Sequence, residues 1–239
     1  MLWRPLLTGA GSAAVPAVGG AAALAAAYAA GDTLRSGGLT AALLLAIAGV
    51  LGCGCFLLPT QALALICGWA LGGWGGAVLA TAAATAAAPL GYALGGSLAG
   101  PGLADWAAHR PRAAAIFHGL QHEPPLRAGG LLALLRLSPV VPFGTINVMS
   151  AVFRLPMAPF MIGTAVGMAP RTTIVAFWGA ALQRLEDGTA RTHPGLLIGG
   201  AIATVAALLL VGWMARRALR GFGQSGGERV RLPDAAAPP

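Results

Sequence analysis

The chain has little negative charge and no lysine. Only seven acidic residues occur in 239, and the fifteen basic residues are all arginine. No charged side chain occurs from Ser36 to Ala104, and no Asp or Glu lies between Glu123 and Glu186. A soluble domain averages about 25% charged residues, whereas this chain has 9%, with 57% hydrophobic residues and a mean hydropathy of +0.76. These deficits exclude an ordinary soluble domain and predict an all-α polytopic membrane protein.

Residues that carry metal or nucleophilic chemistry are also scarce. The three cysteines, Cys53, Cys55 and Cys67, lie in the uncharged stretch, without the spacing or partners of a zinc site. All four histidines lie outside the apolar blocks, which leaves no haem ligand or catalytic base at membrane depth. His118 and His122 are four residues apart and are interpreted as solvated interfacial histidines rather than a metal site. The sequence therefore predicts no enzyme activity, no metal and no cofactor.

The formal net charge of +8 is concentrated toward the C-terminus. Five arginines follow the last apolar run, Leu196 to Met214, so the positive-inside rule places the tail in the cytoplasm. The basic and aromatic residues do not share a polar face, so a nucleic-acid partner is not expected. These features predict a multi-pass protein of the cell (inner) membrane, with the orientation of the N-terminus left open.

The apolar blocks divide the chain into four parts. Residues 1–38 form an N-terminal span and loop, and residues 39–185 form a membrane core. The core contains a first hairpin at about 55–76, an interfacial insertion at 101–127 and a second hairpin at about 131–160. Residues 186–215 form a C-terminal span and residues 216–239 a basic disordered tail. About five to six transmembrane helices are expected.

Prolines and glycines interrupt the core at two corresponding places. A shift of 83 positions superimposes Pro59 on Pro142 and Thr81 on Thr164. A proline removes a backbone donor and disfavours helix in the preceding residue, and broken backbone at membrane depth needs protein or water to satisfy it. The pattern predicts two opposed re-entrant hairpins related as an inverted repeat, with a binding site between them. Ordinary proline-kinked spans are the alternative.

The arginines of the second half supply the candidate site. Arg127, Arg136, Arg154, Arg171 and Arg184 lie in a region without acidic partners, and an unpaired guanidinium at membrane depth needs a backbone, water or ligand partner. We expect a lipid phosphate at Arg136 and Arg171, with the backbone around Pro139 and Pro142 and the amide of Asn147 assisting. Alternatively, Arg136 satisfies carbonyls left free by the prolines, Arg171 snorkels to the interface and Asn147 caps a helix.

In the first hairpin the polar groups are few. Thr60 and Gln61 are its natural pathway residues, and they lie between Pro59 and the glycine cluster that begins at Gly68. Alternatively, these two side chains donate hydrogen bonds to the carbonyls that Pro59 leaves without a backbone donor.

The run Leu135-Arg136-Leu137-Ser138-Pro139-Val140-Val141-Pro142-Phe143, with the first-half run Leu58-Pro59-Thr60-Gln61-Ala62-Leu63, resembles the signatures of the DedA superfamily. These are the VTT-domain membrane proteins, also called SNARE-associated Golgi protein homologues. The resemblance covers roughly residues 45–185. It implies facing re-entrant hairpins and a role in moving or handling phospholipid or polyprenyl phosphate. Some members depend on acidic residues near the first hairpin, thought to couple to protons, and this chain has none from Ser36 to Ala104.

The function expected from these features is binding or translocation of lipid in support of membrane homeostasis. Membrane lipids with phosphate headgroups are the expected partners, and a homo-oligomer is left open. An anion or small-solute transporter that uses the arginines is one alternative, and a non-catalytic membrane scaffold is another. The identity of the lipid, the direction of movement and the energy source are not determined by the sequence.

Overall fold

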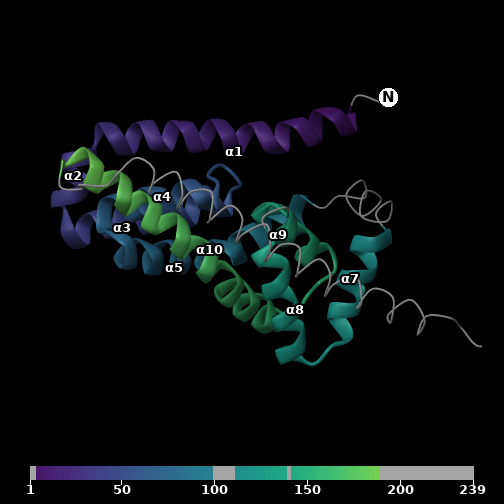
Figure 1. Ribbon diagram of the computed structural model, residues 1–239. Coiled ribbons are helices and arrows are strands. Elements are labelled where there is room, and N and C mark those ends of the chain that lie inside the picture. Colours follow the sequence, from purple (N-terminus) through teal and green to yellow (C-terminus); the bar gives the residue numbers. More distant parts are fainter. Residues whose placement is uncertain (1–3, 99–110, 139–140, 189–239) are drawn as a thin grey trace, which may run out of the picture.

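A computed structural model describes residues 4–98, 111–138 and 141–188 of the chain, and these residues form helices joined by short turns (Figure 1). The predicted all-helical fold is confirmed for this part. Pro139, most of the expected C-terminal span at 186–215 and the tail at 216–239 lie outside the described residues.

The first half contains α1 (Arg4–Ala29), α2 (Gly31–Ser36), α3 (Gly38–Gly54), α4 (Thr60–Leu71) and α5 (Gly73–Leu98). The second half contains α7 (Pro111–His122), α8 (Pro125–Leu137), α9 (Phe143–Val152) and α10 (Met157–Glu186). Two of these helices, over Gly73–Ser97 and Met157–Glu186, are long and apolar enough to cross a membrane. Shorter apolar helices cover Val15–Ala29, Gly38–Gly54, Thr60–Leu71 and Phe143–Val152. The number of spans and the re-entrant character of the hairpins stay predictions.

Prolines determine where several helices begin. Pro59, Pro142 and Pro156 stand directly before α4, α9 and α10, each with φ near −60° and extended ψ. A proline fixes φ and disfavours helix in the residue before it, so each one ends the preceding segment and starts a new helix. The expected breaks at Pro59 and Pro142 therefore lie directly before α4 and α9.

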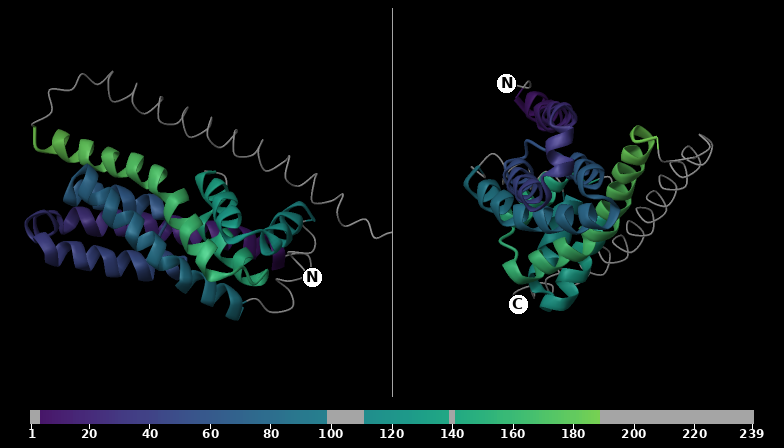
Figure 2. Two further views of the ribbon diagram at one scale, coloured as in Figure 1. Left: turned by 90° about the horizontal axis from the view of Figure 1, so that it is seen from below. Right: turned by 90° about the vertical axis from the view of Figure 1, so that its left-hand side faces the viewer.

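The two halves pack in a matched, crossed arrangement. The long helices α5 and α10 lie against each other, as the two views of Figure 2 show, and each also packs on the helix that begins its own half of the core, α3 or α8. Each short helix packs on the long helix of the other half: α4 along α10, and α9 along α5. Every main contact between the halves thus involves α5 or α10.

Glycines permit the close crossings of the short helices. A Cβ at Gly68 of α4 would overlap the carbonyl oxygen of Ala176 on α10, and a Cβ at Gly179 would overlap that of Leu65. On the other side, a Cβ at Gly95 of α5 would lie 2.9 Å from the Cα of Val148 on α9. Backbone contact at both crossings fixes the short helices deep in the core.

Candidate functional site

Arg136, near the C-terminal end of α8, is the most deeply buried charged residue in the part of the chain that the structure describes, with 1% of its surface exposed. Its Nη2 donates to Asn147 Oδ1 on α9 at 2.6 Å and to Thr164 Oγ1 on α10 at 3.0 Å. Its Nη1 donates to the carbonyl oxygen of Phe143 at 3.3 Å. One guanidinium therefore joins three helices at the centre of the second half.

Aromatic rings enclose the same guanidinium. The ring centroids of Phe143 and Phe160 lie 4.6 and 5.4 Å from its central carbon, within the range of a cation–π interaction. Thr164 Oγ1 donates to the carbonyl oxygen of Phe160 at 2.7 Å and so presents its lone pairs to Arg136. The charge is held by neutral acceptors and ring faces, and no carboxylate contacts it among the described residues.

Three buried side-chain atoms of α8 and α9 have no hydrogen-bond partner among the described residues. They are Arg136 Nε, Asn147 Nδ2 and Ser150 Oγ. The amide of Asn147 points toward Gly91 on α5, where a Cβ would lie 2.5 Å from Nδ2. A buried donor without a partner costs about 1–3 kcal/mol. The site thus holds spare donors of the kind an anion would accept from.

Arg171 forms the second part of the site and lies on α10 directly after Pro170. It is 5% exposed, and its Nη2 donates to Thr60 Oγ1 at 3.2 Å and to Met168 Sδ at 3.5 Å. Thr60 Oγ1 in turn donates to Gln61 Oε1 at 3.2 Å. The first residues of α4 are thereby linked to the second half.

The structure joins five of the residues predicted for the site into two groups. Arg136 contacts Asn147, Arg171 contacts Thr60, and Thr60 contacts Gln61. The bond to Phe143 O means that Arg136 also satisfies one carbonyl beside the break, as the alternative interpretation expected. Asn147 lies within α9 and does not cap it, and Arg171 is buried rather than extended to an interface.

Three other predicted residues have structural positions. Pro59 and Pro142 precede the first residues of α4 and α9, and Gly68 lies at the crossing of α4 with α10.

One expectation about the arginines is wrong. Arg127 is paired, because its Nη1 lies 3.2 Å from Oε2 of Glu123, which precedes α8 and lies at the edge of the acid-free region. Arg154 is exposed at the turn after α9, with φ of 47°.

The partners that sequence reasoning missed are Phe143, Phe160 and Thr164. Phe143 ends the run quoted above and Thr164 is superimposed on Thr81 by the 83-residue shift, but nothing in the sequence indicates that these two residues and Phe160 surround one arginine. They lie 7, 24 and 28 residues from Arg136, and only the packing of α8, α9 and α10 joins them.

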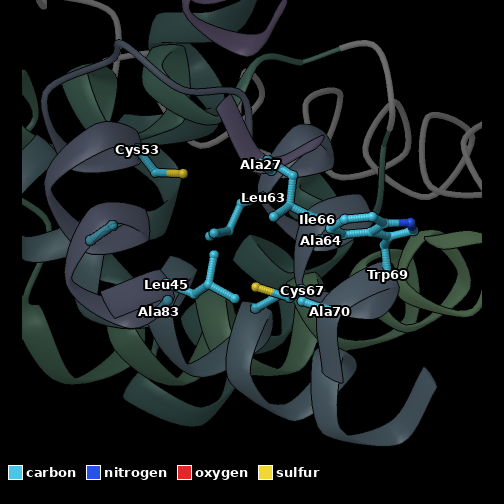
Figure 3. Close-up of a cluster of buried hydrophobic side chains, with 12 residues drawn as sticks. Ala27, Leu45, Cys53, Leu63, Ala64, Ile66, Cys67, Trp69, Ala70 and Ala83 are labelled. Atoms are coloured by element: carbon cyan, nitrogen blue, oxygen red, sulfur yellow. The ribbon is translucent and has the colours of Figure 1, made fainter. Parts of the chain in front are cut away.

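The first half carries an apolar counterpart of this site. The helix boundaries of the two halves match. The last residues of α3 and α8, Gly54 and Leu137, are 83 positions apart, and so are the first residues of α4 and α9, Thr60 and Phe143. The first residues of α5 and α10, Gly73 and Met157, are 84 positions apart. By the offset of 83, Arg136 and Asn147 correspond to Cys53 and Ala64. Both counterparts belong to one buried hydrophobic cluster, part of which is drawn in Figure 3. The buried charge of Arg136 and its amide partner therefore have apolar counterparts in the first half.

Residues 58–181 match the VTT domain family, and this range contains every residue of the site. The chain is 35% identical over 82 residues to the "Transmembrane protein 41 homolog" of Caenorhabditis elegans, a match that covers 33% of each chain. It is 33% identical over 78 residues to "Transmembrane protein 41B" of Danio rerio, covering 32% of this chain and 28% of the relative. The matches thus span about a third of these relatives. No solved structure matches the chain.

Proposed function

Because the chain belongs to the VTT-domain family, as its match over residues 58–181 shows, we propose that it binds the phosphate of a membrane lipid at Arg136 and Arg171 and moves that lipid across the bilayer. Its relatives are transmembrane proteins and its helices are apolar, so the chain is a membrane protein. The lipid as substrate and its movement across the bilayer are what we propose.

The observation that carries the proposal is a pair of buried guanidiniums, those of Arg136 and Arg171. No carboxylate among the described residues contacts either of them. A guanidinium matches phosphate geometry with two parallel donors, and such charge-assisted bonds are about twice as strong as neutral ones. Both guanidiniums contact α10, because Arg171 lies on this helix and Arg136 bonds to its Thr164. With a phosphate bound, Arg136 Nε and Asn147 Nδ2 would gain the acceptor that they lack.

Access to the site requires movement of α9. Arg136 is buried in the described conformation, and its bonds to Asn147 and to Phe143 O are polar links between α8 and α9. A phosphate that accepts from Arg136 competes with both acceptors and frees α9 from α8. We propose that α3–α4 and α8–α9 are the two re-entrant hairpins and that the lipid headgroup passes between them.

The proposal includes the remaining expectations from the sequence. The protein acts without catalysis in the cell (inner) membrane, with its C-terminal arginines on the cytoplasmic side. Phospholipid and polyprenyl phosphate are the candidate substrates, since both present a phosphate on an apolar chain. Coupling to protons through carboxylates in the first hairpin is not part of the proposal, because residues 36–104 contain none.

A small inorganic anion is the second candidate substrate, since the same two arginines would bind it. The test is transbilayer movement in liposomes that contain the purified protein, beside protein-free liposomes. Headgroup-labelled phospholipid, polyprenyl phosphate and trapped sulfate are followed in parallel. Lipid movement above the control supports the proposal, and sulfate release alone would replace lipid with an inorganic anion. No movement of any of the three, in liposomes with correctly inserted protein, would leave a scaffold role and overturn the proposal.

A further inference from the structure

The turn between α3 and α4 holds a phenylalanine in an unusual backbone conformation. Phe56 has φ of 61°, in the left-handed region that glycine adopts without strain and bulky residues rarely enter. The turn is closed by regular hydrogen bonds, because the amides of Leu57 and Leu58 donate to the Gly52 carbonyl oxygen at 2.8 and 2.9 Å. The turn and its packing therefore hold Phe56 in a strained conformation, and such strain is concentrated at functional sites.

The ring of Phe56 fills the space between two glycines of other helices. A Cβ at Gly144, at the start of α9, would lie 2.7 Å from Phe56 Cδ1. A Cβ at Gly91 of α5 would lie 3.3 Å from Phe56 Cε1. Gly144 in particular leaves no room for a side chain beside the ring. The turn of the first half thus places an aromatic ring against the helix of the second half that carries Asn147.

The same ring borders the arginine site. The Cβ position at Gly91 lies 2.5 Å from Asn147 Nδ2 as well as 3.3 Å from the ring, so the amide and the ring meet at one point of α5. Asn147 is fully buried, and its Nδ2 has no hydrogen-bond partner among the described residues, whereas Phe56 is partly exposed. The ring thus reaches from the surface of the protein to a free donor of the residue that holds Arg136.

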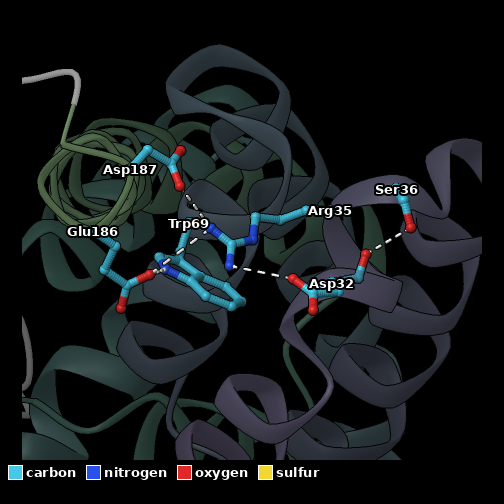
Figure 4. A network of polar contacts seen from close by, with 6 residues as sticks. All are labelled: Asp32, Arg35, Ser36, Trp69, Glu186 and Asp187. Carbon is cyan, nitrogen blue, oxygen red and sulfur yellow. Dashed lines mark hydrogen bonds and ion pairs between the residues drawn. The ribbon is translucent and has the colours of Figure 1, made fainter.

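Other contacts fix α4 and the backbone of the turn. At the far end of α4, Trp69 Nε1 donates to Glu186 Oε2 at 2.9 Å, and the guanidinium of Arg35 lies 4.7 Å from the centre of the Trp69 ring (Figure 4). Behind the turn, a Cβ at Gly19 of α1 would overlap the Leu57 carbonyl oxygen. These contacts oppose withdrawal of α4 or of the whole turn. The side chain of Phe56 can move without breaking either of them.

We propose that Phe56 is the gate residue of the arginine site: its ring closes the side of the site at Asn147 and opens it by moving away from Gly144. This role rests on the proposed function, because a phosphate is what the opened site admits. When the ring leaves, the backbone of Phe56 is free to relax from the left-handed region. Relief of strain therefore favours the open state, and packing of the ring between two helices favours the closed one.

The test measures access to Ser150. Asn147 follows Gly144, and Ser150 follows Asn147, at a spacing of three, so each neighbours the next on the surface of α9. Ser150 is 0% exposed, and Ser150→Cys changes only its oxygen to sulfur. The full chain in detergent, with Cys55→Ser because Cys55 is exposed, is treated with an anionic methanethiosulfonate reagent. Peptide mass spectrometry identifies each modified residue, so reaction at Cys53 is counted separately.

Ser150→Cys should react at least tenfold faster in combination with Phe56→Ala than with Phe56 in place. Leu57→Ala is the matched control, because Leu57 is the next residue of the turn and its side chain is exposed, and it should leave the rate within twofold. Gly144→Ala should also raise the rate, because its Cβ displaces the ring without removing it. Gly130→Ala, whose Cβ would meet no atom within 4 Å, should not. Thermal unfolding of each variant checks its fold.

Unchanged reaction at position 150 in folded Phe56→Ala would overturn the gate. If that variant did not fold, unchanged reaction in Gly144→Ala would do so. The proposed function is tested separately in the opened variant, where inorganic phosphate should slow the reaction at least threefold. A rate that rises in Phe56→Ala but does not respond to phosphate would support the gate and contradict phosphate binding at Arg136.

Discussion

At the scale of single residues, the main question is how a charge is kept inside an apolar helix bundle. Arg136 is held by three oxygen acceptors and two ring faces instead of a carboxylate. A buried carboxylate would neutralise the guanidinium and compete with any anionic ligand. Neutral acceptors solvate the charge and leave it uncompensated, which is the state that a phosphate-binding site requires.

Thr164→Val tests how much this neutral solvation stabilises the fold. Valine has nearly the same shape but cannot accept from Arg136 Nη2, so a buried donor loses one acceptor. We expect the free energy of unfolding to fall by about 1–3 kcal/mol, measured by thermal or denaturant unfolding in detergent. Thr85→Val is the control, because Thr85 is partly exposed and bonds only to the Thr81 carbonyl of its own helix. Equal losses for the two variants would show that Thr164 does not stabilise the charge.

At the scale of single residues, the sequence predicted only part of the site. It indicated Arg136 and Arg171, because charges without acids at membrane depth are visible in composition. It did not indicate Phe143, Phe160 and Thr164 as partners, because their contacts depend on the packing of three helices. The sequence also indicates no acidic partner for Arg127, whereas Glu123, just before α8, pairs with it.

At the scale of helices, prolines set the boundaries and glycines set the distances. The breaks before α4, α9 and α10 follow from Pro59, Pro142 and Pro156 and are predictable from the sequence. The consequence of Gly68 is less predictable. It was expected in the first hairpin as part of the site, and the structure places it against the backbone of α10. A glycine that serves a turn and one that serves a crossing look alike in sequence.

Gly68→Ala is predicted to disturb the crossing of α4 and α10. The added Cβ would overlap the carbonyl oxygen of Ala176, so a backbone must shift, and such overpacking costs about 1–3 kcal/mol or more. The midpoint of thermal unfolding in detergent should fall, along with the yield of monodisperse protein.

Gly130→Ala is the matched control for that change. Gly130 is exposed within α8, and its Cβ would meet no atom within 4 Å, so alanine should stabilise the helix by about 0.5–1 kcal/mol. If Gly68→Ala were as stable as Gly130→Ala, the close crossing of α4 with α10 would be contradicted.

At the scale of the whole molecule, different contacts form at the two opposite ends of α10. Arg35 of α2 bonds to Asp187 after α10 at one end, and Tyr92 of α5 bonds to the Leu155 carbonyl before α10 at the other (Figure 1). Gln121 of α7 also bonds to the Phe153 carbonyl at this second end. If the hairpins are re-entrant, each one enters and leaves at its own end.

Cysteine labelling tests this arrangement in the membrane. In a Cys55→Ser background, because Cys55 is the exposed one of the three cysteines, Ser36→Cys and Asp187→Cys should react with an impermeant thiol reagent from the same side. His122→Cys and Met157→Cys should react from the opposite side. Labelling of Ser36→Cys and Asp187→Cys from different sides would contradict the topology. The Cys55→Ser protein without an added cysteine is the unreactive control, because Cys53 and Cys67 are buried.

The repeat itself was visible in the sequence through the 83-residue shift between Pro59 and Pro142, and the helix boundaries follow it. The difference between the halves was not visible in the same way. Cys53 and Ala64 occupy the positions that correspond to Arg136 and Asn147, and only aligned helices show that a buried charge and an apolar cluster are counterparts.

This correspondence supplies the most direct test of the central claim, that Arg136 binds the phosphate of a transported lipid. The measurement is the rate of transbilayer movement of headgroup-labelled phospholipid in liposomes containing wild type, Arg136→Ala, Arg136→Lys or Cys53→Ala, each at the same inserted density. Cys53→Ala changes the buried counterpart of Arg136 in the other half. The account predicts that Arg136→Ala falls to the protein-free rate, Arg136→Lys retains part of the activity and Cys53→Ala resembles wild type. Unchanged movement in folded Arg136→Ala would contradict it.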